Sequence, residues 1–134
     1  MPEHFLVLLP KFLAYFAVAS ILLALFVVIY VNVTPYAEFA LMRTNNTAAA
    51  TSLSGTLIGF AIPVANVVAH SDTILDLIFW GVVAGIVQLL VYAVARLTLP
   101  KLAEDIPAGH MAPAIFLAAL SITVGLLNAA CMSY

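Results

Sequence analysis

Charged residues are scarce in this chain of 134 residues: four are Lys or Arg and six are Asp or Glu. Together they make up 7% of the chain, whereas a soluble domain carries about 25%. Hydrophobic residues make up 66%, and the mean hydropathy is +1.21. A chain with this few polar residues cannot cover a globule in water. The composition therefore excludes a soluble domain and favours a membrane protein.

Cysteine and basic clusters are also nearly absent. The single Cys131 excludes an intrachain disulfide and a metal site built from cysteines. A net charge of −2 without a basic cluster gives no electrostatic footprint for nucleic acid, so no nucleic-acid partner is expected. The connecting segments are too short to hold a separate soluble domain.

Four windows contain no charged residue, and all ten charges lie before or between them. These windows are residues 12–31, 47–69, 77–95 and 112–132. Each holds about 19 to 23 residues, which at ~1.5 Å per residue crosses a hydrocarbon core ~30 Å thick. The first window is too long for the apolar core of a signal peptide, so we interpret it as a retained span. The sequence predicts an all-α integral membrane bundle of four transmembrane helices.

The connections between these windows alternate long, short, long, which predicts two tandem helical hairpins. A shift of about 64 to 66 residues overlays Glu38 on Glu104 and Asn46 on His110, with alanines after each of the latter two. A chance likeness between two loop-to-membrane junctions is the alternative. The loop motif shared by the two copies consists of Thr34, Pro35, Glu38, Asn46, Gly109 and His110.

We therefore predict one membrane domain made of two two-span repeats, residues 1–69 and 70–134. A two-span unit returns the chain to its starting side, so the two repeats have the same orientation. Their axis then lies along the membrane normal.

Lys and Arg residues predict the orientation. The two long loops carry Arg43, Arg96 and Lys101, while the opposite side carries only Lys11. The positive-inside rule places both long loops in the cytoplasm and both termini outside it.

Tyrosines near the predicted cytoplasmic ends of the spans fit an interfacial aromatic belt. Tyr30, Tyr36 and Tyr92 lie at this level, where amphipathic rings prefer the headgroup region.

Small residues recur at helical spacing in three of the windows. Residues four apart share a helix face, and small side chains there let two backbones approach closely in lipid. The proline in this series kinks its helix, as a structural feature or as a functional hinge. The predicted helix-packing residues are Thr51, Gly55, Gly59, Pro63, Gly81, Gly85 and Gly125.

Three amides, Asn66, Gln88 and Asn128, are the largest polar side chains inside the windows, and none of the polar groups there is ionisable. Ion pathways and proton relays usually need an ionisable group within the membrane. We interpret the amides as interhelical hydrogen-bonding groups. The alternative is that they line a pore shared by several subunits.

No motif of an enzyme is present: the chain has no nucleophile elbow, zinc-protease motif or phosphate loop. His70, Asp72 and Asp76 lie close in sequence, but a solvated turn explains them better than a metal site. We expect no catalytic residue, no metal and no cofactor.

Several longer motifs carry a resemblance to a known family. They include T-P-Y-A-E-F at 34–39, N-N-T-A-A-A at 45–50, G-T-L-I-G-F-A-I-P at 55–63 and G-L-L-N-A-A-C-M-S-Y at 125–134. Over essentially its whole length the chain resembles the YjfL-type bacterial inner-membrane proteins, a family described as a domain of unknown function (number 350). One departure is Asn45, where the family pattern has Gly. Asn tolerates a left-handed backbone, so the turn can survive the change.

The resemblance implies a bacterial inner-membrane location and four spans, and it supplies no activity. Because such relatives occur in envelope-stress contexts, it also implies an accessory role. We therefore expect a non-enzymatic multi-pass protein that acts in the lipid bilayer through oligomerisation or through a membrane or peripheral protein partner. The alternative is an oligomeric channel or transporter for a small solute or ion.

Overall fold

The computed structural model describes residues 2–132, and helices account for nearly all of them. No strand occurs in this part of the chain, and four of the helices are long and apolar enough to cross a membrane. The expected all-α fold with four candidate spans is therefore confirmed. The helices are α1 (Pro2–Val33), α2 (Glu38–Arg43), α3 (Thr47–His70), α4 (Ile74–Thr98), α5 (Leu102–Asp105) and α6 (Met111–Cys131).

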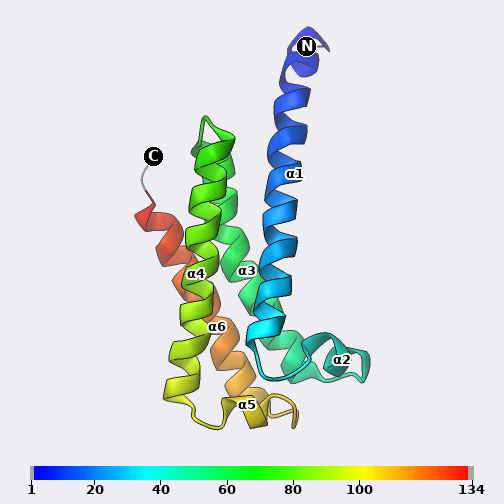
Figure 1. The fold of residues 1–134 in the computed structure, drawn as a ribbon, viewed down its shortest axis with the longest axis vertical. Coiled ribbons are helices and arrows are strands. Elements are labelled where there is room, and N and C mark those ends of the chain that lie inside the picture. Colours follow the sequence, from blue (N-terminus) through cyan, green and yellow to red (C-terminus); the bar gives the residue numbers. More distant parts are fainter. Residues whose placement is uncertain (1, 133–134) are drawn as a thin grey trace.

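Helices α3, α4 and α6 form a three-helix core, and α1 lies beside it against α3 and α4 (Figure 1). The most extensive contact is between α3 and α6. In the most apolar window of α3, 50% of the residues are buried, against 11% in that of α1. α1 is thus the peripheral helix of the bundle.

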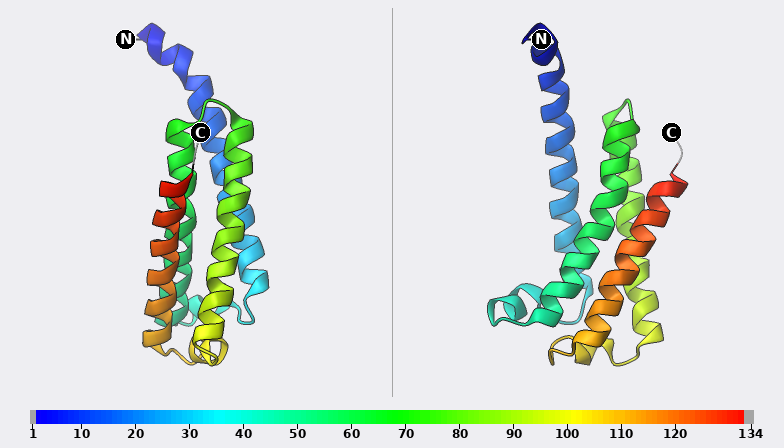
Figure 2. Two further views of the ribbon diagram at one scale, coloured as in Figure 1. Left: turned by 90° about the vertical axis from the view of Figure 1, so that its left-hand side faces the viewer. Right: turned by 180° about the vertical axis from the view of Figure 1, so that it is seen from behind.

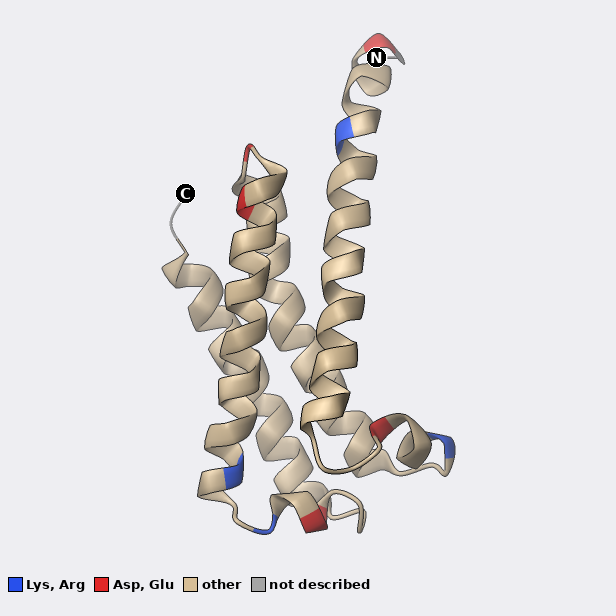
Figure 3. Cartoon of the chain, in the orientation of Figure 1, with Lys and Arg blue, Asp and Glu red and all other residues tan. Residues whose placement is uncertain are grey.

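The start of α1 and the end of α6 lie at the same end of the bundle as the short turn between α3 and α4, and both long loops lie at the other end (Figures 1 and 2). α2 and α5 are short helices within those two loops. Charged residues gather at the two ends and leave the middle of the long helices free of charge (Figure 3).

Side-chain caps fix where two of the long helices begin. The side-chain oxygen of Asn46 accepts a hydrogen bond from the backbone N–H of Ala49 at 2.9 Å, at the start of α3. Thr73 accepts the equivalent bond from the N–H of Asp76 at 3.2 Å, at the start of α4. Such caps satisfy backbone donors that the first helical turn leaves without a partner.

Helix α1 extends well past the turn between α3 and α4 (Figure 1). The hydroxyl of Tyr15 donates to the carbonyl of Ser71 at 3.4 Å, so this tyrosine lies level with the end of α3. Residues 2–14 therefore continue beyond the core for about 20 Å at the rise of an α-helix.

Glycines make the α3–α6 contact close enough for the two backbones to touch. A Cβ added at Gly55 would collide with the backbone of Ala118, and one added at Gly59 would collide with the carbonyl of Ser121. A Cβ at Gly125 would collide with the carbonyl of Gly59. Larger residues at these positions would force the helices apart.

Pro63 is buried within α3, where it removes the hydrogen bond that the carbonyl of Gly59 would otherwise accept in the helix. That carbonyl is the one against which Gly125 of α6 packs. The proline therefore leaves a freed carbonyl facing the neighbouring helix where the two backbones are in close contact.

The glycines of α4 have a different neighbour, helix α1. A Cβ at Gly81 would meet the end of the Leu22 side chain at 2.8 Å, and one at Gly85 would meet Phe26 at an ordinary 3.5 Å. These glycines leave room for flexible side chains and do not bring two backbones together. Thr51 is half-buried at the start of the glycine series in α3.

Candidate functional site

The segment between α1 and α2 buries every second residue. Thr34, Tyr36 and Glu38 are buried, whereas the residues that alternate with them are exposed. Ala37 has extended backbone angles, φ −89° and ψ 92°, and in an extended chain alternate side chains point to the same side. The T-P-Y-A-E-F motif thereby directs a hydroxyl, a phenol and a carboxyl into the protein.

The carboxyl group of Glu38 is almost completely enclosed, with a relative exposure of 1%. Its Oε1 accepts a hydrogen bond from the hydroxyl of Thr34 at 2.8 Å, and its Oε2 has no hydrogen-bond partner within residues 2–132. Burial raises the pKa of Glu38 above its ordinary value, and the Thr34 bond opposes this shift. Burial disfavours the charged form of a carboxyl because it removes the hydration of the charge.

Three tyrosine side chains surround this acid. Tyr30 comes from the last turns of α1, Tyr92 from α4 and Tyr36 from the connection between α1 and α2. The rings of Tyr30 and Tyr92 meet edge to face with centroids 5.9 Å apart. Burial raises the pKa of Tyr36, and the nearby groups Tyr30, Tyr92 and Glu38 raise it further. We refer to Glu38, Tyr30, Tyr36 and Tyr92 as the acid–tyrosine cluster.

These tyrosines do not form the interfacial belt expected from the sequence. Their exposed fractions are 1% for Tyr30, 7% for Tyr36 and 3% for Tyr92, so the rings are enclosed by protein. That interpretation is wrong because each ring faces the core from a different element. The alternation of polar and apolar residues from Thr34 to Phe39 was the available signal that this loop segment is half-buried.

A chain of buried hydroxyls connects the cluster to the centre of the bundle. The hydroxyl of Thr56 donates to that of Tyr30 at 3.3 Å and lies 3.4 Å from that of Ser121. The side-chain amide of Gln88 donates to the carbonyl of Ser121 at 3.1 Å, while its Oε1 has no hydrogen-bond partner among the described residues. Three long helices besides α1 thus contribute polar groups to one buried region.

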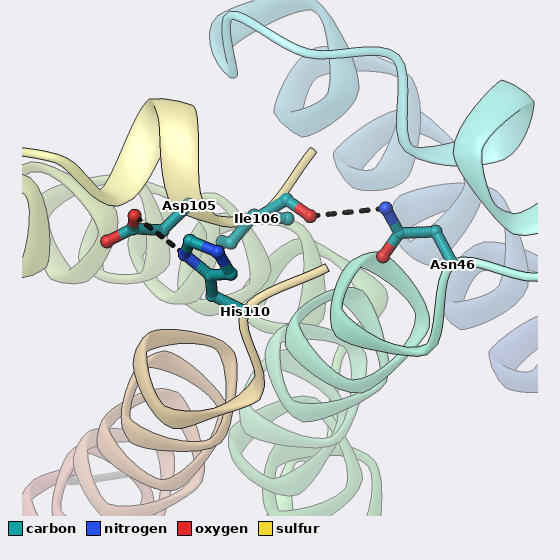
Figure 4. Close-up of polar contacts among 4 residues, drawn as sticks. All are labelled: Asn46, Asp105, Ile106 and His110. Atoms are coloured by element: carbon teal, nitrogen blue, oxygen red, sulfur yellow. Dashed lines mark hydrogen bonds and ion pairs between the residues drawn. The ribbon is translucent and has the colours of Figure 1, made fainter. Parts of the chain in front are cut away.

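The two long loops contact each other beside this region (Figure 4). The side-chain amide of Asn46 donates to the carbonyls of Ile106 and Pro107 at 3.2 Å and 3.1 Å. His110 makes no side-chain cap at the start of α6, and its Nδ1 instead lies 3.0 Å from Oδ1 of Asp105. Asn46 is therefore the residue of the loop motif whose side chain joins the two loops by hydrogen bonds.

The remaining motif residues serve the turns that precede α3 and α6. Gly109 has a positive φ of 83°, and Asn45 has a positive φ of 67°. Each of these residues stands directly before the N-cap residue of its helix, so the left-handed turn is present at Asn45 despite the missing glycine. Pro35 is exposed between the two buried residues Thr34 and Tyr36.

The amides near the opposite end of the bundle lie apart from the acid–tyrosine cluster. Asn66 donates to the carbonyl of Ala129 at 2.9 Å and so joins α3 to α6. The Nδ2 of Asn128 is buried without a hydrogen-bond partner within residues 2–132. The Nδ1 of His70 lies 2.9 Å from the carbonyl of Asn66, one turn earlier in the same helix.

The described residues offer no metal centre of the usual kind. No three side chains of the His, Cys, Asp and Glu types gather closely enough there to hold a metal ion. Cys131 is exposed and free.

Comparisons with known proteins give a family and no activity. The family model described as "Domain of Unknown Function (DUF350)" matches residues 4–132. The chain is 38% identical to the UPF0719 inner membrane protein YjfL of Escherichia coli (strain K12), over 98% of this chain and 99% of the relative. It is 26% identical to the UPF0719 transmembrane protein YshE of Bacillus subtilis (strain 168), over 84% of each chain. No solved structure matches.

Proposed function

We propose, since this chain belongs to the family described as Domain of Unknown Function (DUF350), that it is an accessory inner-membrane protein that acts by binding and not by catalysis. The family membership and the four apolar helices make it a multi-pass membrane protein of unknown function. The binding element in this proposal is helix α1, and the partner is a second copy of the chain.

The observation that carries the proposal is the apolar surface of α1. Phe5, Leu8, Phe12 and Phe16 recur at helical spacing, and their exposed fractions lie between 46% and 62%. Part of this stripe belongs to residues 2–14, which extend beyond the α3–α4 turn (Figure 1). In lipid, acyl chains cover such a stripe as well as protein does, so the support for a protein partner comes from residues 2–14, which extend past the end of the core.

The loose seat of α1 on its own core also supports this proposal. A groove of about 200 Å³ runs between α1 and α4, and one of about 320 Å³ between α1 and α3. Because α1 is covered on so little of its surface, both of its grooved sides can accept another apolar helix.

Disulfide crosslinking of the intact protein in its membrane tests self-association. In a Cys131→Ala background, we expect Leu8→Cys and Phe12→Cys to form dimers on oxidation. Leu97→Cys, at an 83% exposed position on α4, is the matched control and should remain monomeric. Equal crosslinking at all three positions would indicate random collision, and no crosslinking at positions 8 and 12 would contradict the proposal.

The proposed orientation has both termini outside the cytoplasm. Arg43, Arg96 and Lys101 at the loop end against Lys11 at the other end support it through the positive-inside rule. In the same Cys131→Ala background, an impermeant thiol reagent added to intact cells should label a cysteine at position 73 but not at 43 or 103. The reverse pattern would invert this orientation.

The proposal includes an accessory role in envelope stress, and this part rests only on the resemblance to the YjfL-type family. A deletion strain should then show a growth defect that appears under envelope stress and is absent in unstressed medium. Complementation by Leu8→Asp should fail where the wild-type chain succeeds. Normal growth of the deletion strain under such stress would remove this part of the proposal.

An oligomeric channel or transporter for a small solute or ion is the second candidate. The buried polar groups between Glu38 and Gln88 favour it, because they extend from the loop end into the bundle. The close backbone contact between α3 and α6 argues against an aqueous path within one chain. We expect no conductance from purified protein in planar bilayers. Single-channel currents that Gln88→Leu abolishes would favour this second candidate.

A further inference from the structure

The acid–tyrosine cluster holds three buried oxygen atoms that make no close hydrogen bond to the rest of the described chain. They are Oε2 of Glu38 and the hydroxyls of Tyr36 and Tyr92, and these two hydroxyls interact with each other. Each parent residue is more than nine-tenths buried, and a buried polar group without a partner is costly. Three such groups in one cluster at the loop end of the bundle indicate a site for a small ligand that oxygen atoms can bind.

The charge balance of the cluster selects the kind of ligand. The groups that face Glu38 are Thr34 and Tyr36 from its own segment, Tyr30 from α1 and Tyr92 from α4. All four are neutral side chains, and no salt bridge reaches Glu38 in the part of the chain that the structure describes.

The nearest basic group along α4 is Arg96, one turn after Tyr92. Its side chain is exposed and makes no ion pair with the acid. Arg96 acts on Tyr92 through its charge without pairing with Glu38, so the ionised carboxylate would be buried with no salt bridge to the described residues, a state that burial disfavours.

We propose that Glu38, together with Tyr36 and Tyr92, forms a proton-binding site at the loop end of the bundle. One proton from the aqueous phase binds the carboxylate at Oε2, and the buried charge is removed without any other bond being formed or broken. The protonated Oε2 then carries a hydrogen-bond donor in place of an unpaired charge. Burial holds the pKa of Tyr36 high, so that phenol stays neutral and does not compete as an acid.

Proton binding at Glu38 has a defined effect on stability. Its pKa is raised in the folded protein, so the folded state holds the proton more tightly than the unfolded chain does. The stabilisation is complete below the unfolded pKa and is lost as the pH rises through the higher folded pKa. Among the acids at the loop end, Glu104 is exposed, so it provides a matched control.

Thermal unfolding of the intact protein in detergent, measured at a series of pH values, tests the site. The wild-type melting temperature should fall as the pH rises above the ordinary glutamate range. The Glu38→Gln variant should have a flat profile over the same range, because its amide is neutral throughout, and Glu104→Gln should keep the wild-type profile. An equal fall in the wild type and in Glu38→Gln, or a flat wild-type profile, would overturn the proposal.

Two further measurements decide the ligand and cover a variant that fails to fold. At constant pH and ionic strength, replacing choline by sodium or potassium should leave the wild-type melting temperature unchanged. Stabilisation by either metal ion would show that the site binds an alkali cation and would contradict the proposal that its ligand is a proton. Infrared spectra of the wild type should show one carboxylic-acid band that persists after the exposed acids have ionised; its absence would also overturn the site.

Discussion

The two halves of the chain contain similar elements that the fold uses differently. Each half has a long apolar helix, a loop with a short helix and a second long apolar helix. Yet α4 packs within the three-helix core, whereas its counterpart α1 lies at the periphery with two grooves beside it. Elements with similar positions in the sequence therefore do not have equivalent environments.

The loops differ in the same way. Glu38 in the first loop is enclosed by three tyrosines, while Glu104 in the second is exposed. Asn46 caps α3 and binds the other loop, while the imidazole of His110 interacts with Asp105 of its own loop. Burial and hydrogen bonding are concentrated in the first loop, and for this reason the candidate site lies there.

The largest effect is expected where the two halves touch backbone to backbone. Gly59→Ala should destabilise the protein by about 3 kcal/mol or more, because its Cβ would collide with the rigid carbonyl of Ser121. Gly85→Ala is the matched control on the α1 side, where the new Cβ has ordinary contacts with Phe26 and Phe60. Thermal unfolding in detergent measures both. Equal stability of the two variants would mean that the α3–α6 contact is no closer than the contact of α4 with α1.

A medium effect is expected at the loop contact. Asn46→Ala removes the cap of α3 and the bonds to the carbonyls of Ile106 and Pro107, at a cost of about 1–2 kcal/mol. Asn46→Asp keeps a cap acceptor and loses the donor, so its unfolding temperature should fall between those of the wild type and the alanine variant. His110→Ala should change stability little, since its side chain is 63% exposed. A larger loss from His110→Ala than from Asn46→Ala would reverse the ranking of the two loops.

The smallest effect is expected at the two left-handed turns. Gly109→Ala should cost about 1 kcal/mol through backbone strain alone, because nothing lies within 4 Å of the added Cβ. Asn45→Gly should be neutral or slightly stabilising, since glycine adopts its φ of 67° without strain. Chemical unfolding curves of both variants measure these differences. A clear loss from Asn45→Gly would mean that the asparagine side chain has a role beyond the turn.

The sequence predicted the parts of this molecule that depend on composition and on local chemistry. Charge-free windows of sufficient length predicted the four helices, since a bilayer fixes both the length and the polarity of a span. The left-handed turn at Asn45 was expected from its place in the loop motif, since it depends on short-range geometry, whereas the cap by Asn46 was seen only in the structure. The two-repeat organisation stays a prediction, which the matching turns at Asn45 and Gly109 support.

Only the tertiary structure decided which apolar faces meet and which polar residues they enclose. Lipid and protein interior are similarly apolar, so hydropathy cannot tell a lipid-facing side of a helix from a buried one. Tyr30 and Tyr92 occupy helix ends, where the sequence favours an interfacial position, but both rings are buried, pack edge to face and lie near Glu38. Three separate elements meet at that carboxyl. The sequence by itself determined that this chain spans a membrane, and the packing of those elements decided that a loop glutamate is buried without a salt bridge in the described part of the chain.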